Sequence, residues 1–186
     1  NKYGKRLFIG IPAGYEIKPI LTKIHSSIEH NPRQIRWVPT NNIHMTLSFL
    51  GNICLENIPQ LIQALENLLD LDNFRASIEK TGVFPSNQFP KILWLGIGHE
   101  REKILELNKL VEKAVASFKE SRKKEVFIPH ITIGRTTQSC GKIDFLPFME
   151  YVYSPIELDV NSLALYESQL LPEGAKYKVL FEFLLN

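Results

Sequence analysis

A short pattern that occurs twice constrains the fold of this 186-residue chain more than any other feature. One copy lies in residues 42–51 and the other in residues 127–135, and both contain His-x-Thr with apolar residues at the x positions. The two histidines, at positions 44 and 130, are 86 residues apart, so each half of the chain carries one copy. Apolar, β-branched runs that lead to a glycine predict β-strands.

The side chains of these two strands are predicted to form one polar face each. Because alternate side chains of a strand point the same way, His44, Thr46 and Ser48 would share a face. By the same alternation, His130 and Thr132 would share a face, with apolar residues behind them. Two such strands facing each other would form a four-group site with approximate two-fold symmetry.

Two histidines suit phosphodiester cleavage without a metal ion. One imidazole accepts a proton from the attacking oxygen, and an imidazolium donates one to the leaving oxygen. An unperturbed pKa of about 6.5 makes both forms available near neutral pH. The alternative is that each histidine is a structural residue of a half-buried strand, which the repetition makes less attractive. No base partner accompanies Ser48 and no ligand spacing accompanies the histidines, so neither a serine nucleophile nor a metal site is expected.

Hydrophobic periodicity predicts three helices, over residues 16–30, 56–70 and 101–118. Strands are predicted around them, and loops at 81–90 and 136–148. Because strands often come in pairs between helices, an α+β fold with antiparallel sheets is favoured over a parallel doubly wound sheet. The predicted strands are residues 5–11, 35–38, 42–51, 74–80, 91–98, 127–135, 156–166 and 176–184. Side chains expected at the surface are His25, His30 and His99, and those expected in the core are Trp37 and Trp94.

Composition narrows the class of protein. A hydrophobic content of 44% and a charged content of 23% are typical of a soluble globular protein. The net charge of +2 is nearly balanced, so any nucleic-acid binding must come from local clusters such as the basic run 119–124. Cys54 and Cys140 have neither disulfide nor metal-binding spacing. With no apolar stretch near ~20 residues and no secretory signal, a cytoplasmic location without membrane contact is expected. The chain starts at Asn1 rather than Met, so we expect that natural first residues are missing.

The two motifs and the segments around them resemble the two-histidine phosphoesterase superfamily. In particular they look like its RNA 2′,3′-cyclic phosphodiesterase branch, also named 2′-5′ RNA ligase, whose members act in RNA processing. The similarity follows the order of the chain over nearly its whole length. The segments that carry it, besides the motifs and Arg135, are residues 6–12, 36–38, 82–85, 93–96 and 165–168, and Gly174, Ala175 and Tyr177.

This resemblance implies a fold, a reaction and residue roles. The fold would be two interleaved lobes of antiparallel sheet, helices outside, related by a pseudo-two-fold around a central active-site cleft, in one bilobal domain over 1–186. The reaction would be hydrolysis of an RNA 2′,3′-cyclic phosphate to a 2′-phosphate, without cofactor or metal. His44 would be the proton donor and His130 the acceptor, with Thr46 and Thr132 on the non-bridging oxygens. Arg135 would bind the phosphate, although a regular strand puts it opposite His130 unless the preceding glycine lets the chain turn.

Several alternatives remain open at this level. The same site could open a small cyclic phosphate such as ADP-ribose 1″,2″-cyclic phosphate, cleave 2′-5′ oligonucleotides, or weakly join tRNA halves by a reversible 2′-5′ ligation. From another class, the chain could be a non-catalytic module that binds RNA ends. A monomer is expected. Aromatic side chains could stack the terminal base or belong to the core; these are Phe8, Phe49, Phe84 and Tyr166.

Overall fold

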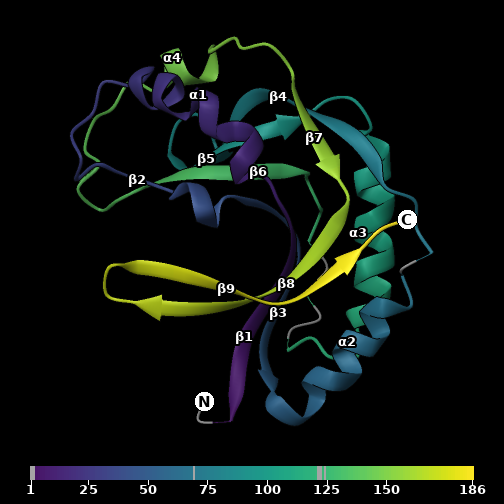
Figure 1. Cartoon of the computed structure of the whole chain (residues 1–186). Coiled ribbons are helices and arrows are strands. Elements are labelled where there is room, and N and C mark those ends of the chain that lie inside the picture. The colour runs from purple at the N-terminus through teal and green to yellow at the C-terminus, as the bar shows by residue number, and fades with distance from the viewer. Residues whose placement is uncertain (1–2, 69, 121–122, 124) are drawn as a thin grey trace.

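The computed structural model describes residues 3–68, 70–120, 123 and 125–186 (Figure 1). The strands it describes are β1 (Gly4–Pro12), β2 (Ile35–Trp37), β3 (His44–Cys54), β4 (Phe74–Pro85), β5 (Pro90–Ile97), β6 (His130–Thr136), β7 (Ile156–Val160), β8 (Ser162–Leu171) and β9 (Gly174–Leu184). The helices are α1 (Gly14–Ser26), α2 (Ile58–Glu66), α3 (Arg101–Val115) and the short α4 (Leu146–Met149), with 3-10 turns at Thr40–Asn42 and Leu55–Asn57.

The strands form two antiparallel sheets whose members interleave along the chain. The first sheet has the order β3-β1-β8-β9 and the second has the order β2-β6-β5-β4-β7. Each motif strand pairs with the strand that leads into a helix: β3 pairs with β1, which precedes α1, and β6 pairs with β5, which precedes α3. This repeated arrangement gives the molecule an internal pseudo-symmetry, and it confirms the predicted α+β class with antiparallel sheets.

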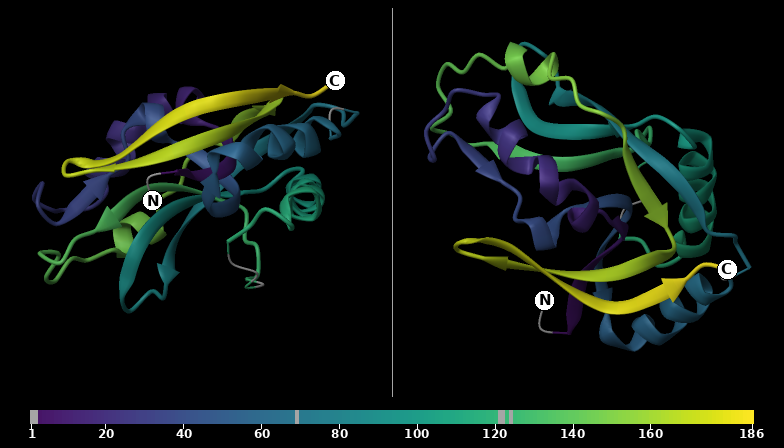
Figure 2. Two further views of the ribbon diagram at one scale, coloured as in Figure 1. Left: turned by 90° about the horizontal axis from the view of Figure 1, so that it is seen from below. Right: turned by 45° about the horizontal axis from the view of Figure 1, so that its top comes forward.

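One hydrophobic core joins the two sheets and the helices. Its buried side chains include Ile9 from the first sheet, Leu95 from the second sheet and Ile24 from α1. Helices α2 and α3 contact each other, α3 also contacts β3, and α1 contacts β7. Figure 2 shows α2 and α3 side by side and the long β8–β9 hairpin extending away from them. The core therefore fixes the two motif strands from behind.

Several predicted boundaries are wrong. The first helix ends at Ser26 rather than at residue 30. Strand β4 continues through the predicted loop to Pro85, because Lys80 takes a positive φ of 64° as an extra residue and the pairing with β5 resumes after it. The predicted strand 156–166 is two strands, β7 and β8, which belong to different sheets and separate at Asn161. Local alternation cannot reveal such a change of sheet.

Candidate active site

The two motifs meet in space although they belong to different sheets. Strands β3 and β6 contact each other. The pKa of His44 is affected by the charge of His130 as well as that of Arg135. The four predicted motif side chains, those of His44, Thr46, His130 and Thr132, thus come from two strands held together by tertiary packing.

The first motif fixes both nitrogens of its imidazole. His44 Nδ1 lies 2.7 Å from the carbonyl oxygen of Asn42, and its Nε2 lies 2.8 Å from Thr46 Oγ1. A carbonyl only accepts, so Nδ1 carries a proton and donates it to Asn42. In the neutral imidazole, Nε2 then accepts from the Thr46 hydroxyl. The Asn42 side chain in turn donates to the carbonyl of Ala175 in β9 at 2.9 Å, which ties this turn to the far end of the sheet.

The second motif repeats half of this arrangement. His130 Nδ1 lies 2.6 Å from the carbonyl oxygen of Ile128, again two residues upstream, so Nδ1 is again the donor. Within the described part of the chain, no hydrogen bond joins His130 Nε2 to Thr132 or to any other group. Both histidines therefore direct Nδ1 to the backbone, which leaves Nε2 for other partners. Nε2 bonds to a hydroxyl in the first motif and has no described partner in the second.

Aromatic rings surround His44 on the first sheet. The ring centroid of Phe8 lies 4.7 Å from that of His44, with Tyr177 at 5.3 Å and Tyr166 at 5.5 Å. Two of the four predicted stacking candidates, Phe8 and Tyr166, thus contact the first histidine, but both are buried against each other. In the sequence, only the family resemblance pointed to Tyr177. The alternation of side chains along β9, which pairs with β8, is the signal that could have predicted its place beside His44.

His130 has fewer aromatic neighbours. Phe84 lies 5.0 Å from its ring centroid, edge-on, and Trp94 lies 6.0 Å away. Both side chains are half-buried, so the prediction that Trp94 belongs to the core is only partly met. Strand β4 brings Phe84 here only because it continues through the segment predicted to be a loop. This residue was a stacking candidate, and the structure puts its ring edge against the second histidine.

Burial sets the charge state of both imidazoles. Desolvation lowers the pKa of His44 to about 4; its bond to Asn42 opposes this shift, while the positive charges of Arg135 and His130 add to it. Desolvation also lowers the pKa of His130, again opposed by its backbone bond and increased by Arg135. Both imidazoles are thus neutral at pH 7 without a ligand. An anion bound beside them would raise both pKa values.

A β-bulge after each His-x-Thr decides which later side chains reach the site. In the first sheet Gly10 faces Thr46 and Ile9 faces Ser48, which leaves Leu47 as the extra residue of β3. Paired residues share a face, so Ser48 turns with Ile9 into the core, where its side chain is 3% exposed. The prediction that Ser48 shares the His44 face is therefore wrong. Phe49, the next residue, moves onto that face.

The bulge in β6 does the same for Arg135. Trp94 faces Thr132 and Leu93 faces Gly134, which leaves Ile133 as the extra residue. Arg135 then pairs with Ile92 on the face of Thr132 and His130, whereas a regular strand would have put it on the opposite face. Gly134 is required here because a Cβ would meet the ring of Trp37. Arg135 is exposed, and its charge lowers the pKa of both histidines.

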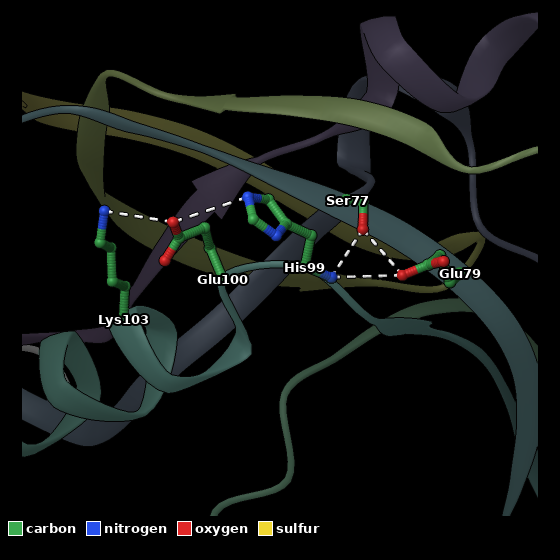
Figure 3. Close-up of polar contacts among 5 residues, drawn as sticks. All are labelled: Ser77, Glu79, His99, Glu100 and Lys103. Carbon is green, nitrogen blue, oxygen red and sulfur yellow. Dashed lines mark hydrogen bonds and ion pairs between the residues drawn. The ribbon is translucent and has the colours of Figure 1, made fainter.

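A second polar cluster has residue types found in hydrolases but not their geometry (Figure 3). Ser77 Oγ donates to Glu79 at 2.8 Å, and it accepts from the backbone N–H of His99 at 2.7 Å. The His99 imidazole points instead to Glu100 at 3.6 Å, which also contacts Lys103. No imidazole among the described residues is positioned to activate Ser77, so the cluster fixes the turn that leads into α3. His99 is exposed, as predicted.

His25 and His30 are not the surface residues predicted from their place near a helix end. His25 stacks on Trp37 with ring centroids 4.0 Å apart. Trp37 Nε1 donates to His30 Nε2 at 2.9 Å, and His30 Nδ1 contacts the Ile28 carbonyl at 2.8 Å. This packing supports β2 from the side that faces away from Arg135. It fixes the position of β6 without adding a reactive group.

Other predicted features have a limited part in the site. Lys119 contacts Glu112 at 2.8 Å, whereas residues 121, 122 and 124 of the basic run lie outside the described residues. Among the side chains that the structure describes, no group of three or more His, Cys, Asp or Glu could hold a metal ion. No described helix is both long enough and apolar enough to cross a bilayer.

Comparison with known proteins shows which family the chain matches. The model of the 2′-5′ RNA ligase superfamily matches residues 21–170. An RNA 2′,3′-cyclic phosphodiesterase of Aquifex aeolicus is 31% identical over 192 residues, covering 97% of each chain. One of Thermotoga maritima is 29% identical over 178 residues, covering 95% of this chain and 94% of that protein.

Solved structures show the same fold. The crystal structure of TT0787 of Thermus thermophilus superposes with a TM-score of 0.78 at 27% identity, covering 97% of both chains. Apo LigT of E. coli, at 21% identity, superposes with a TM-score of 0.75 and covers 99% of both chains. The paired His-x-Thr strands, the two interleaved sheets and the match over most of the sequence lead to one conclusion: this chain belongs to the 2′-5′ RNA ligase superfamily.

Proposed function

We propose that the protein hydrolyses RNA 2′,3′-cyclic phosphate ends to 2′-phosphates by metal-independent acid–base catalysis. The observation that carries the proposal is the placement of two imidazoles with Nε2 as the reactive nitrogen, both within electrostatic reach of Arg135. The names of the relatives from Aquifex aeolicus and Thermotoga maritima support the same substrate class.

In the proposed mechanism His130 is the general base and His44 the general acid. Nε2 of neutral His130 takes a proton from a water molecule as the water oxygen attacks phosphorus. The bond from phosphorus to the 3′ oxygen breaks, and Nε2–H of His44 protonates that oxygen. The product has a 2′-phosphate and a free 3′ hydroxyl. Loss of the proton from His130 to solvent restores the resting enzyme, in which both imidazoles are neutral, and His44 takes up a proton again when the next substrate binds.

The substrate itself would prepare the acid. His44 is neutral at pH 7 without ligand, because burial and the charge of Arg135 lower its pKa. A cyclic phosphate is an anion, so its binding would offset Arg135 and raise the pKa of His44 toward the range where it can donate. Once Nε2 is protonated it no longer accepts from Thr46, and that hydroxyl becomes available to a non-bridging oxygen. Thr132, on the face of His130, would contact the other one.

The proposal includes finer points on substrate and assembly. RNA fragments such as tRNA halves that end in a 2′,3′-cyclic phosphate are candidate substrates, and the reverse reaction would give weak 2′-5′ ligation. The protein would act as a monomer, because one chain supplies both motifs. The remaining candidates are hydrolysis of small cyclic phosphates or 2′-5′ oligonucleotides, and RNA-end binding without turnover.

The test is turnover of a short RNA with a 2′,3′-cyclic phosphate end in the presence of EDTA. We expect the wild-type protein to form a 2′-phosphate, and His44→Ala and His130→Ala each to lose a factor of about 10² to 10⁴ in rate. His99→Ala is the matched control, because that histidine is exposed and outside the site. Binding without product would favour the RNA-end module, and a 3′-phosphate product or recovery only with a divalent ion would refute the mechanism.

A further inference from the structure

The edge strand β2 carries a second arginine next to Arg135. In the pairing of β2 with β6, Arg36 is directly opposite Arg135, and Trp37 is opposite Gly134. Directly opposite residues share a face of the sheet. Trp37 packs over Gly134 on the core side, so Arg36 projects with Arg135 to the other side, the one occupied by His130. Both arginine side chains are exposed.

A pair of like charges in this position is unfavourable for the sheet by itself. Like charges directly opposite each other destabilise a strand pair, whereas opposite charges stabilise it. The same sheet shows the stabilising version elsewhere: Arg75 in β4 is directly opposite Asp159 in β7, and its Nε lies 2.7 Å from the carboxylate. The pairing of Arg36 with Arg135 is the reverse of that arrangement.

No described carboxylate compensates this pair. In the part of the chain that the structure describes, neither Arg36 nor Arg135 has a carboxylate within 4.0 Å. Two adjacent guanidinium groups of this kind form a site for an anion, and their planar donors match phosphate. Arg135 lies on the same face of β6 as Thr132 and His130, so it would be the nearer of the two to the reacting phosphate. Arg36 is one strand farther out, on the edge strand β2.

We propose that Arg36 binds the phosphodiester next to the reacting phosphate, so that the enzyme prefers an RNA end to a nucleoside cyclic phosphate. This inference rests on the proposed function. RNA would enter over the edge strand β2, with its last internucleotide phosphate on Arg36 and its cyclic phosphate between Arg135 and the two histidines. Arg36 is a specificity residue in this arrangement and takes no part in proton transfer.

The experiment compares two substrates in one buffer. One is a nucleoside 2′,3′-cyclic phosphate, and the other is the dinucleotide with one internucleotide phosphate before the same cyclic phosphate. Arg36→Gln should lower the ratio of their kcat/KM values, dinucleotide to nucleoside, by about tenfold, mainly through the KM of the dinucleotide. Arg33→Gln is the control. Arg33 lies three residues before Arg36 and outside β2, so this variant removes the same charge and should leave the ratio unchanged.

Salt dependence gives a readout that a structural role would not change. Each phosphate contact to a single strand contributes about 0.7 to the slope of log affinity against log salt. The dinucleotide slope should therefore fall by about 0.7 in Arg36→Gln, with no such change for the nucleoside substrate. Equal ratios and slopes in wild type and variant would overturn the inference and leave the proposed function intact. A wild-type protein that turns over neither substrate would instead refute the proposed function.

Stability separates this role from a structural one. Arg36→Glu would create the charge pairing seen between Arg75 and Asp159, so its unfolding midpoint should rise relative to wild type. The kcat/KM for the dinucleotide should fall more in this variant than in Arg36→Gln, because the new carboxylate would also form an ion pair with Arg135 and compete with the phosphate. A variant that is both less stable and less active would indicate that Arg36 serves the fold.

Discussion

The two motif strands are built alike up to the threonine and differ in the side chains beyond it. Each has His-x-Thr, a bulge at the next residue, and then a side chain five positions after the histidine that returns to the histidine face. That side chain is Phe49 in the first strand and Arg135 in the second. Phe49 is 64% exposed and lies 5.9 Å from Phe8, ring to ring. One equivalent backbone position thus gives the site an aromatic side and a cationic side.

The surroundings of the two histidines also differ, with more aromatic rings around His44 than around His130. His44 is enclosed by three aromatic rings and bonded to Thr46, and its pKa falls to about 4. His130 has two rings beside it and no hydrogen bond from Nε2 to a described residue, and its pKa is lowered to a smaller extent. A nearly symmetric pair of motifs therefore produces an asymmetric site, suited to a substrate with a nucleobase on one side and a phosphate on the other.

The largest expected effect is on the rate of hydrolysis, and changing the leaving atom distinguishes the roles of the two histidines. His44→Ala should lose about 10² to 10⁴ in rate on the ordinary substrate. It should lose far less when the leaving 3′ oxygen is replaced by sulfur, because a thiol with a pKa of about 8.5 leaves without a proton donor. His130→Ala should lose equally on both substrates. Rates of the two variants on the two substrates check this, and sulfur rescue of His130→Ala instead would exchange the assigned roles.

The cationic side is tested by Arg135→Gln. Loss of the charged phosphate contact should lower kcat/KM by about a hundredfold. Because Arg135 lowers the pKa of His130, its removal should raise that pKa. The base must be unprotonated, so activity in the variant should fall off at a higher pH as acid is added. A pH profile of kcat/KM measures this, with Lys91→Gln as control, because Lys91 is exposed at the start of β5. An unchanged acid limb would place Arg135 away from the base.

The aromatic side is tested by Phe49→Ala. Base stacking on an aromatic side chain contributes about 1–3 kcal/mol, so KM should rise by about tenfold with little change in kcat. Phe89→Ala is the control, because Phe89 is 73% exposed in the turn between β4 and β5. Kinetics on a ribose cyclic phosphate that lacks a base should show no difference between wild type and Phe49→Ala. A loss that persists on that substrate would contradict stacking at Phe49.

The smallest effect concerns stability rather than rate. Folded His44 has a pKa of about 4, whereas the unfolded chain titrates near 6.5. Between these values the unfolded state binds the proton first, so folding is destabilised as pH falls below 6.5, by about 2 kcal/mol at pH 5. The drop in unfolding free energy from pH 7 to pH 5 should shrink by that amount in His44→Gln and by less in His130→Gln. Denaturant titrations at both pH values measure it; equal drops in wild type and His44→Gln would contradict the burial argument.

Much of the architecture follows from local patterns. The strands that carry the motifs, the helical stripes of α2 and α3, and the antiparallel class are readable from periodicity, because side-chain spacing reports which face is buried. The predictions that were wrong, of one strand boundary and of two surface side chains, depend on residues that are distant in sequence. β7 and β8 read as one strand until the chain changes sheets at Asn161, and His25 and His30 read as surface residues until Trp37 of β2 covers them.

The sequence by itself determined the chemistry available: two imidazoles and two hydroxyls on strands, in an order that resembles one superfamily. The tertiary structure decided how these groups are combined. A bulge is defined by how two strands pair, and the partners of β3 and β6 lie far from them in sequence, so no local pattern shows that Leu47 and Ile133 are extra residues. Those two bulges turn Ser48 into the core and bring Phe49 and Arg135 to the site.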